Sequence, residues 1–247
     1  MKNTRKKRIL FLSWKDINHP GAGGAELLTD TLATHMAQHY EVEYFTSSYP
    51  GALPVEQVHG YTIIRKGNIY TTYLHAFLWW HWNRMYHKKY SCIIDQVHGI
   101  PFFSLLYIFH PPINTLVMEI AGELWQKNYP NSIGIVGKIL ERIWLALYRS
   151  SVITTISEST KNELLARHIP ARHIYMIPMF SPMQCNAIPI KATSPTLLMV
   201  GRIAPVKRIE DAIEAYKIAH KSIPSLQFVI IGRTESMYAK YTSYLLQ

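Results

Sequence analysis

The sequence predicts an α/β protein, in which a doubly wound, mostly parallel sheet is followed by the beginning of a second domain of the same type. Three observations lead to this prediction. Short β-type runs alternate with helical segments before residue 178, a stretch with four prolines then breaks the pattern, and the alternation resumes after it. Such alternation is typical of βαβ units, whose helices cover both faces of a parallel sheet.

The first domain is expected to hold residues 1–190, with a linker that begins at about residue 178. Its first strand, "RILFLSW", leads into an amphipathic helix from Ala25 to Gln38, and a second strand, "EVEYFTS", follows. Loops or helices separate the later strands from one another. These strands are expected at 61–66, 91–97, 114–119 and 151–157, and the remaining helices at 72–89 and 133–149.

The second domain is expected to begin within residues 191–247. A strand is predicted over 196–201, a helix over 207–220 and another strand over 226–232. A parallel sheet of two strands cannot bury both of its faces, so this Rossmann-like domain is expected to be incomplete. The predicted helix has one apolar stripe at helical spacing, formed by Ile209, Ala212, Ile213, Tyr216 and Ala219.

The net charge and the cysteine content of the chain indicate which partners it binds and in which cellular compartment it works. The net charge of +10 favours an anionic partner, and nucleic acid, anionic lipid and phosphorylated ligands all qualify. The sequence contains no nucleic-acid recognition module, which makes nucleic acid the least favoured of the three. The two cysteines, Cys92 and Cys185, suggest neither a disulfide framework nor a zinc site, so we expect a cytoplasmic protein.

Tryptophans and lysines lie close together between Trp79 and Lys89. This combination suits a peripheral contact with an anionic membrane, because indole rings sit at headgroup depth and cations meet anionic lipid. A helix with a Trp-rich buried face has the same pattern, and both interpretations stay open. No stretch reaches the ~20 apolar residues that a transmembrane helix needs.

The stretch "HPGAGGAELL" (residues 19–28) has the composition of a phosphate-binding turn before a helix. It does not fit a dinucleotide fingerprint, because six residues separate the strand from Gly21 and Glu26 occupies the last motif position. It is not a P-loop either, since no Gly-Lys-Ser/Thr follows. Gly23 and Gly24 would still let an anion approach the free N–H groups of a helix start. A simple tight turn is the alternative.

Two further loops favour the anion site. "GRIAPVK" places Arg202 and Lys207 between a strand and a helix, where two cations could hold a diphosphate. "TTISESTKNEL" leaves the last strand of the first domain and begins a helix through Ser157 or Ser159. With these three loops in this order, the chain resembles the GT-B-fold retaining glycosyltransferases of family 4, and "VGRIAPVK" is the most specific part of the resemblance.

The resemblance implies two facing α/β domains, a nucleotide-sugar donor, retention at the anomeric carbon, and neither metal nor cofactor. Gly23 and Gly24 would offer N–H groups to the diphosphate or to the acceptor, while Arg202 and Lys207 would neutralise the diphosphate. Together with the basic, aromatic-rich surface, the three loops predict transfer to a lipid-linked or cell-envelope glycan, by a cytoplasmic protein that is peripheral on the inner face of the membrane. The alternative is a truncated, non-catalytic remnant or binding module of the same fold.

Two features depart from the family. Some members have a His after the strand that here ends in Met118 and Glu119. Glu119 and His98 are therefore the candidates for the catalytic polar group, although a structural role is common for both residue types. The family's Glu-x7-Glu element, which contacts the sugar and the ribose, lies farther into the second domain than Gln247.

Overall fold

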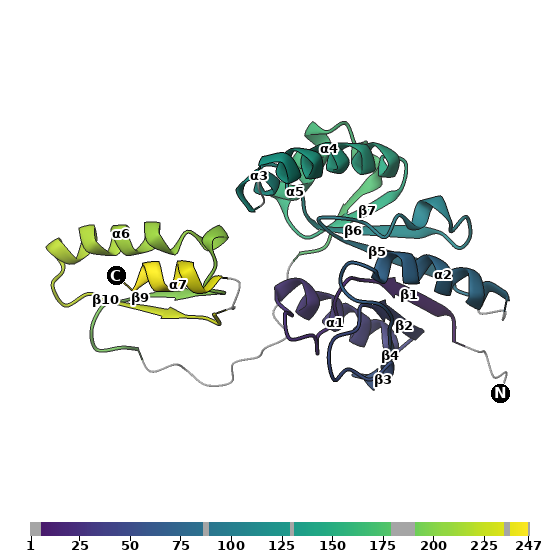
Figure 1. Cartoon of the computed structure of the whole chain (residues 1–247), viewed down its shortest axis with the longest axis horizontal. Coiled ribbons are helices and arrows are strands. Elements are labelled where there is room, and N and C mark those ends of the chain that lie inside the picture. Colours follow the sequence, from purple (N-terminus) through teal and green to yellow (C-terminus); the bar gives the residue numbers. More distant parts are fainter. Residues whose placement is uncertain (1–5, 86–88, 129–130, 179–190, 235–237, 247) are drawn as a thin grey trace. The chain divides into compact units, whose positions relative to one another are not determined.

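The computed structural model describes residues 6–85, 89–128, 131–178, 191–234 and 238–246. The chain divides into two compact units, residues 1–125 with 131–182, and residues 183–247 with 126–130. The predicted domain boundary at residues 190 and 191, and most of the predicted linker, fall at or within a segment outside the described residues. Figure 1 draws both units, and each has a sheet of its own.

Unit 1 is built on a sheet of eight described strands in the order β3-β4-β2-β1-β5-β6-β7-β8. Every neighbouring pair is parallel except β3 with β4, which is antiparallel. The predicted doubly wound, mostly parallel sheet is thus confirmed. The strands are β1 (Arg8–Leu12), β2 (Glu41–Thr46), β3 (Val55–Val58), β4 (Tyr61–Arg65), β5 (Cys92–His98), β6 (Ile113–Glu119), β7 (Val152–Thr155) and β8 (Ile174–Met176).

Helices cover both faces of this sheet (Figure 1). Successive strand residues point to opposite faces, and β1 shows this clearly: Phe11 packs in the cluster that includes α1, whereas Leu10 and Leu12 pack in the cluster that includes α2. A third cluster joins α4 and α5 to the outer strands. The helices are α1 (Gly24–Ala37), α2 (Thr72–Met85), α3 (Leu124–Asn128), α4 (Asn131–Tyr148) and α5 (Glu158–Ala166).

The tryptophans of α2 belong largely to the core. Trp79 and Trp80 are 8% and 7% exposed and pack against Phe45 and Tyr90. Trp82 is 63% exposed. Of the two interpretations left open for the segment from Trp79 to Lys89, the buried helix face holds for Trp79 and Trp80, because their side chains fill the space between α2 and the sheet. Residues 86–88 of that segment lie outside the described part of the chain.

Unit 2 contains the parallel pair β9 (Thr196–Val200) and β10 (Gln227–Ile231), with α6 (Ile209–Ser222) and α7 (Ala239–Leu245). The helix predicted from Lys207 begins two residues later, because Pro205–Lys207 form a 3-10 turn and Arg208 has a left-handed φ of 50°. Gly232 is required where the strands end: a Cβ there would lie 1.8 Å from the carbonyl oxygen of Gly201.

One face of this small sheet is uncovered within the described residues. Its apolar side chains alternate along both strands, and the parallel register sets Leu198 beside Val229 and Val200 beside Ile231. Each of the four is between 39% and 71% exposed. The sheet of this Rossmann-like unit thus leaves one face open within the described residues, as two strands predict.

Candidate functional site

The carboxyl ends of the parallel strands bring the polar candidates of unit 1 to one edge of the sheet. His98 ends β5 and Glu119 ends β6, and the two residues are partners in the strand register, where the ladder shifts between Val97 and His98. Edges of this kind hold the ligand sites of open α/β sheets. The sequence predicted both residues separately, and the fold places them side by side.

His98 is held against a tryptophan from the first loop. Its imidazole stacks on the indole of Trp14, with ring centroids 5.3 Å apart and planes inclined by 27°. The side chain of His98 is half-buried, and its Nδ1 is buried with no hydrogen-bond partner among the described residues. Glu119 is exposed, whereas the preceding Met118 is buried. The edge therefore offers one oriented imidazole and one solvated carboxylate.

Lys15, in the same loop, is a further cation beside Trp14 that was not among the predicted site residues. Its Nζ lies 4.3 Å from the ring centroid of Trp14 and donates a hydrogen bond of 3.3 Å to the carbonyl of Gly21. A cation directly after the first strand was the available signal. The loop thus adds a positive charge near the glycines and near the ring that supports His98.

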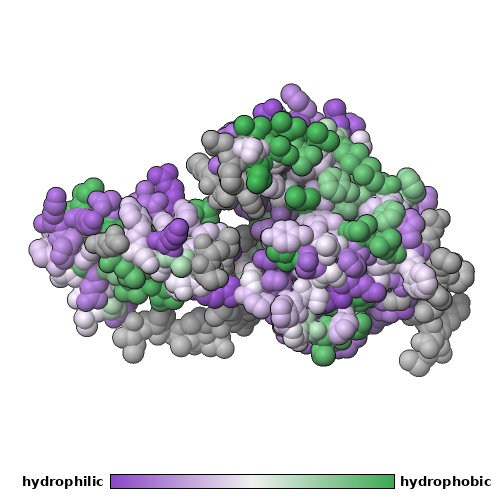
Figure 2. Space-filling view, in the orientation of Figure 1, coloured by the Kyte–Doolittle hydropathy of each residue, from purple (hydrophilic) through white to green (hydrophobic). Residues whose placement is uncertain are grey.

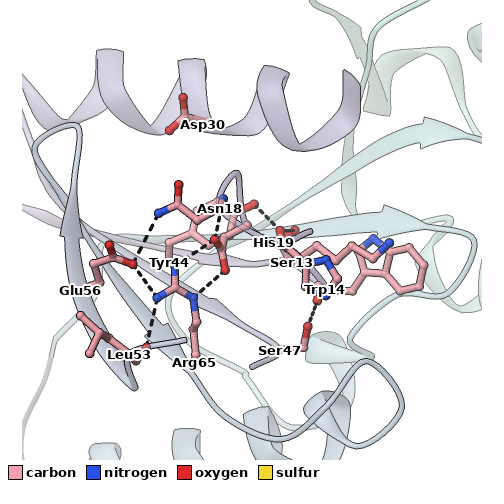
Figure 3. Close-up of polar contacts among 12 residues, drawn as sticks. Ser13, Trp14, Asn18, His19, Asp30, Tyr44, Ser47, Leu53, Glu56 and Arg65 are labelled. Carbon is pink, nitrogen blue, oxygen red and sulfur yellow. Dashed lines mark hydrogen bonds and ion pairs between the residues drawn. The ribbon is translucent and has the colours of Figure 1, made fainter. Parts of the chain in front are cut away.

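A buried ion pair between Asp16 and Arg65 anchors the same loop, and Figure 3 shows Arg65 with Glu56 and Leu53 beside it. The Asp16 carboxylate accepts hydrogen bonds from Nε and Nη2 of Arg65 at 2.8 and 3.0 Å, and both side chains are fully buried. Arg65 Nη1 also donates to Glu56 at 2.7 Å and to the carbonyl of Leu53 at 3.1 Å. Bidentate pairing fixes orientation as well as distance, so the loop is tied to β4 at a defined place.

The two predicted glycines differ in what surrounds them. Gly23 precedes α1, and its N–H already donates to Glu26 Oε2 at 2.7 Å. Gly24 opens the helix, and a Cβ there would meet nothing within 4 Å. The N–H groups of a first helical turn have no partner within the helix. Gly24 is therefore the glycine with open space beside a helix start.

His19 shapes the turn before these glycines. Its Nδ1 accepts a hydrogen bond of 2.9 Å from the N–H of Gly21, and its ring packs edge-on against Tyr49. Burial lowers the pKa of His19 below its ordinary value of 6.5, and the positive charge of Lys15 lowers this pKa further. The neutral ring, which alone can accept at Nδ1, is thus the favoured form.

The helix that follows β7 begins at Ser157. The Ser157 side chain accepts a hydrogen bond of 3.2 Å from the Thr160 N–H, as an N-cap does, and Glu158 lies in the first turn. Ser159 is within the helix, and its hydroxyl lies 3.1 Å from that of Ser157. Of the two predicted starts, Ser157 is the cap.

In unit 2, the predicted cations share one strand-to-helix loop. Lys207 Cε would lie 4.0 Å from a Cβ on Gly201, so its side chain returns to the turn that carries Arg202. Arg202 and Lys207 are both exposed. The neighbouring Arg208 pairs with Asp211, at 2.6 Å between Nε and Oδ2. Arg202 and Lys207 thus lie near the end of β9, whereas Arg208 pairs with a side chain of α6.

Neither a metal cluster nor a membrane-spanning helix is found within the described ranges. No group of three or more His, Cys, Asp or Glu side chains there is placed to hold a metal ion. No helix among these residues is both long and apolar enough to cross a bilayer.

Several solved structures share this fold. Sucrose-phosphate synthase from Thermosynechococcus elongatus is 18% identical, with a TM-score of 0.69 over 98% of this chain and 67% of that one. A UDP-forming α,α-trehalose-phosphate synthase from Burkholderia vietnamiensis is 10% identical, with a TM-score of 0.59 over 98% and 68%. The lipopolysaccharide outer core galactosyltransferase WaaB is 15% identical, with a TM-score of 0.51 over 96% and 64%.

This chain therefore spans about two thirds of the length of these structures. No match is found among curated proteins. The sequence profile described as Glycosyltransferase Family 4 matches residues 22–180, and that of Glycosyl transferases group 1 matches residues 184–247. The first match covers well over half of the chain, and both agree with the GT-B fold of the two units. The chain belongs to glycosyltransferase family 4.

Proposed function

We propose that this chain transfers a sugar, with retention, from a nucleotide-sugar donor to a lipid-linked or cell-envelope glycan. The observation that carries the proposal is the loop after β9, where Lys207 folds back toward the turn of Arg202 within the group 1 match. The family assignment supports a hexosyl-type transferase. The donor, the acceptor and the activity of this chain are parts of the proposal.

The proposed role of the two cations follows from the chemistry of transfer. When the bond between the anomeric carbon and the diphosphate breaks, the sugar becomes oxocarbenium-like and negative charge develops on the diphosphate. Cations placed where that charge develops lower the barrier. Arg202 and Lys207 would supply this stabilisation, so the proposed reaction requires no metal and no cofactor.

The edge of unit 1 would receive the acceptor. His98 has an oriented ring with an unpartnered nitrogen among the described residues, and Glu119 adds a carboxylate beside it in the register. We propose that one of them contacts the acceptor hydroxyl, as a polar group in hydrogen-bond reach of a reacting proton can do. Gly24 would let a phosphate or a sugar approach the start of α1, and Gly23 and the Ser157–Ser159 pair would border the same edge.

Binding of a nucleoside diphosphate tests the donor part of the proposal. Calorimetric titration with uridine, guanosine and adenosine diphosphates should give a dissociation constant in about the millimolar range for at least one of them. Arg202→Ala and Lys207→Ala should each weaken binding by about tenfold, the effect of losing one charged hydrogen bond. Arg208→Ala is the matched control, because Arg208 is engaged with Asp211. Equal binding by all four proteins would contradict the assignment.

A non-catalytic member of the family is the second candidate. The uncovered face of β9 and β10 favours it, since a donor site that lacks part of its domain would bind a diphosphate without supporting transfer. Labelled nucleotide sugars separate the two candidates. Transfer to a glycolipid acceptor, or slow hydrolysis of a donor, supports the enzyme; diphosphate binding without either reaction supports the binding module.

A cytoplasmic location with peripheral contact to the membrane belongs to the same proposal. The enzyme has to bind a bilayer-anchored acceptor at the bilayer surface. The net charge of +10 favours its binding to anionic lipid over neutral lipid. Nucleic acid is not part of the proposal.

A further inference from the structure

Helix α4 presents apolar side chains on the side away from the sheet, where a helix of a water-facing layer usually carries polar ones. Figure 2 shows hydrophobic residues gathered along the helix that Figure 1 labels α4. They recur three and four positions apart, so they form one continuous stripe along its 18 residues. The exposed members are Ile133, Ile135, Val136, Ile139, Leu140, Ile143 and Leu147, each between 41% and 59% exposed.

The opposite side of α4 is committed to the core. Trp144, Leu145 and Tyr148 are buried in the cluster that joins α4 to β5, β6 and β7. Tyr148 also donates a hydrogen bond of 2.8 Å to the buried Asp95. These contacts fix the rotation of the helix, so the apolar stripe cannot turn inward. The apolar stripe can therefore enter an apolar environment only if the axis of α4 lies parallel to the surface of that environment.

Cations border the stripe on one side. Lys138 and Arg142 are one turn apart on α4, and Arg149 directly follows the last residue of the helix, Tyr148. Arg142 and Arg149 are exposed, and Lys138 pairs with Glu123. The single carboxylate of the helix, Glu141, is 2% exposed and points inward. The outer surface of α4 therefore combines apolar residues with two exposed arginines at its border, and the helix itself exposes no carboxylate.

The inward-pointing Glu141 connects the helix to the edge that carries Glu119. Its carboxylate accepts hydrogen bonds of 3.0 Å from the N–H groups of Ala121 and Gly122, directly after β6. Arg142 lines a pocket with Gly122 at the same place. Helix α4 is thus bonded directly to the loop that follows the candidate acceptor side.

We infer that α4 docks flat into the interface of an anionic bilayer, with its apolar stripe among the acyl chains and its bordering cations at the headgroups. An amphipathic helix with a basic border binds membranes in this way. The inference deepens the proposed function and rests on its lipid-linked acceptor, since the docked helix would hold the edge of β6 beside the lipid surface.

Cosedimentation with lipid vesicles, in the absence of any nucleotide, tests the inference separately from the donor site. The protein should bind vesicles that contain phosphatidylglycerol, bind pure phosphatidylcholine much more weakly, and be released as salt rises. The pair Leu140→Gln with Ile143→Gln should weaken binding on the order of tenfold, because two half-exposed apolar side chains are lost from the interface. Arg142→Gln should weaken it about fivefold.

A matched pair on α2 is the control. Leu74 and Leu78 are 59% and 54% exposed and are also one turn apart on a helix. Leu74→Gln with Leu78→Gln should leave vesicle binding within about twofold of the unchanged protein.

Undiminished binding by the protein with Leu140→Gln and Ile143→Gln overturns the inference. So does a dimer, seen by sedimentation without lipid, that this pair dissociates, because the stripe would then be covered by a second copy. Diphosphate binding should be the same in all of these variants.

Discussion

The imidazole of His98 stacks on the indole of Trp14, with ring centroids 5.3 Å apart, although His98 ends β5, Trp14 lies in the loop after β1, and the two are 84 positions apart in the sequence. Lys15 lies over the same indole, at 4.3 Å from its centroid. The indole thus contacts both a cation and an imidazole, and the Ser47 hydroxyl donates to the Trp14 carbonyl, which holds the backbone of this loop. The orientation of His98 depends on this ring.

Replacing Trp14 by Leu should release His98 from the stacked position. A proton above an aromatic ring is shielded, so the ring-proton resonances of His98 should move downfield in the Trp14→Leu protein, which NMR of labelled histidines would show. Phe77→Leu is a matched control, since the ring of Phe77 packs against His81 and Tyr107 instead. Unchanged His98 resonances would mean that the stacking does not persist in solution.

The turn at Gly21 should weaken in acid. Protonation of His19 removes the acceptor of the Gly21 N–H, and the pKa of His19 is lower in the folded protein than its ordinary value of 6.5. The unfolded chain therefore binds this proton first, so the stability that the bond contributes is complete above about pH 6.5 and is lost as the pH falls through the folded pKa. Urea unfolding measured across this range should show the decline.

Lys15→Met should raise the pKa of His19, because the positive charge of Lys15 helps to lower it, while burial keeps it below 6.5. The acid loss of stability should then be smaller. NMR titration of His19 measures the change directly. Lys66→Met removes an exposed cation elsewhere and should not alter this titration; a His19 pKa that is the same in both variants would contradict the role of Lys15.

Loss of the buried ion pair should cost more than loss of a surface pair. Asp16→Ala leaves the Arg65 guanidinium buried with Glu56 as its remaining carboxylate, and should lower the free energy of unfolding by about 3–5 kcal/mol. Replacing both partners, as Asp16→Leu with Arg65→Met, should cost less than the sum of the single changes, because no buried charge is left unpaired.

Lys161→Ala is the control for this comparison. Lys161 pairs with Glu158 at 3.1 Å, and the two side chains are 34% and 58% exposed, so its loss should change stability by about 0.5 kcal/mol or less. Urea denaturation followed by far-UV circular dichroism measures all of these variants. An Asp16→Ala effect as small as that of Lys161→Ala would show that the ion pair does not anchor the loop.

The main strands and helices could be predicted because their patterns are local. The segment from Ala25 to Gln38 has the helical period, and α1 was found at nearly the same residues. Strand β3 was missed because "VEQV" alternates weakly at an exposed edge, where pairing with β4 and not burial makes it a strand. The start of α6 was shifted because a proline turn and the left-handed Arg208 precede it.

The candidate residues could be predicted one at a time, but their neighbours could not. His98 and Glu119 were visible as polar residues at strand ends, whereas their pairing depends on the register of β5 with β6. The supports of the first loop lie far away in the sequence: Arg65 is 49 positions from Asp16. Long-range partners of this kind leave no spacing that a single sequence reveals. The exposed stripe of α4 was hidden for a similar reason, since periodicity does not tell which side of a helix faces the sheet.

The two glycines that end β9 and β10 should respond differently to the same substitution. A Cβ on Gly232 would lie 1.8 Å from the Gly201 carbonyl oxygen, a backbone atom that cannot move without parting the strands. A Cβ on Gly201 would lie 4.0 Å from Lys207 Cε, which is an ordinary contact with the end of a flexible side chain. Gly232→Ala should therefore destabilise unit 2 by about 3–5 kcal/mol, while Gly201→Ala should cost about 1 kcal/mol or less. Hydrogen exchange of the backbone amides measures this loss of stability strand by strand. In Gly232→Ala the amides of β9 and β10 should lose protection while those of β5 and β6 keep theirs; equal protection in both variants would mean that the strands are not joined so closely at this point.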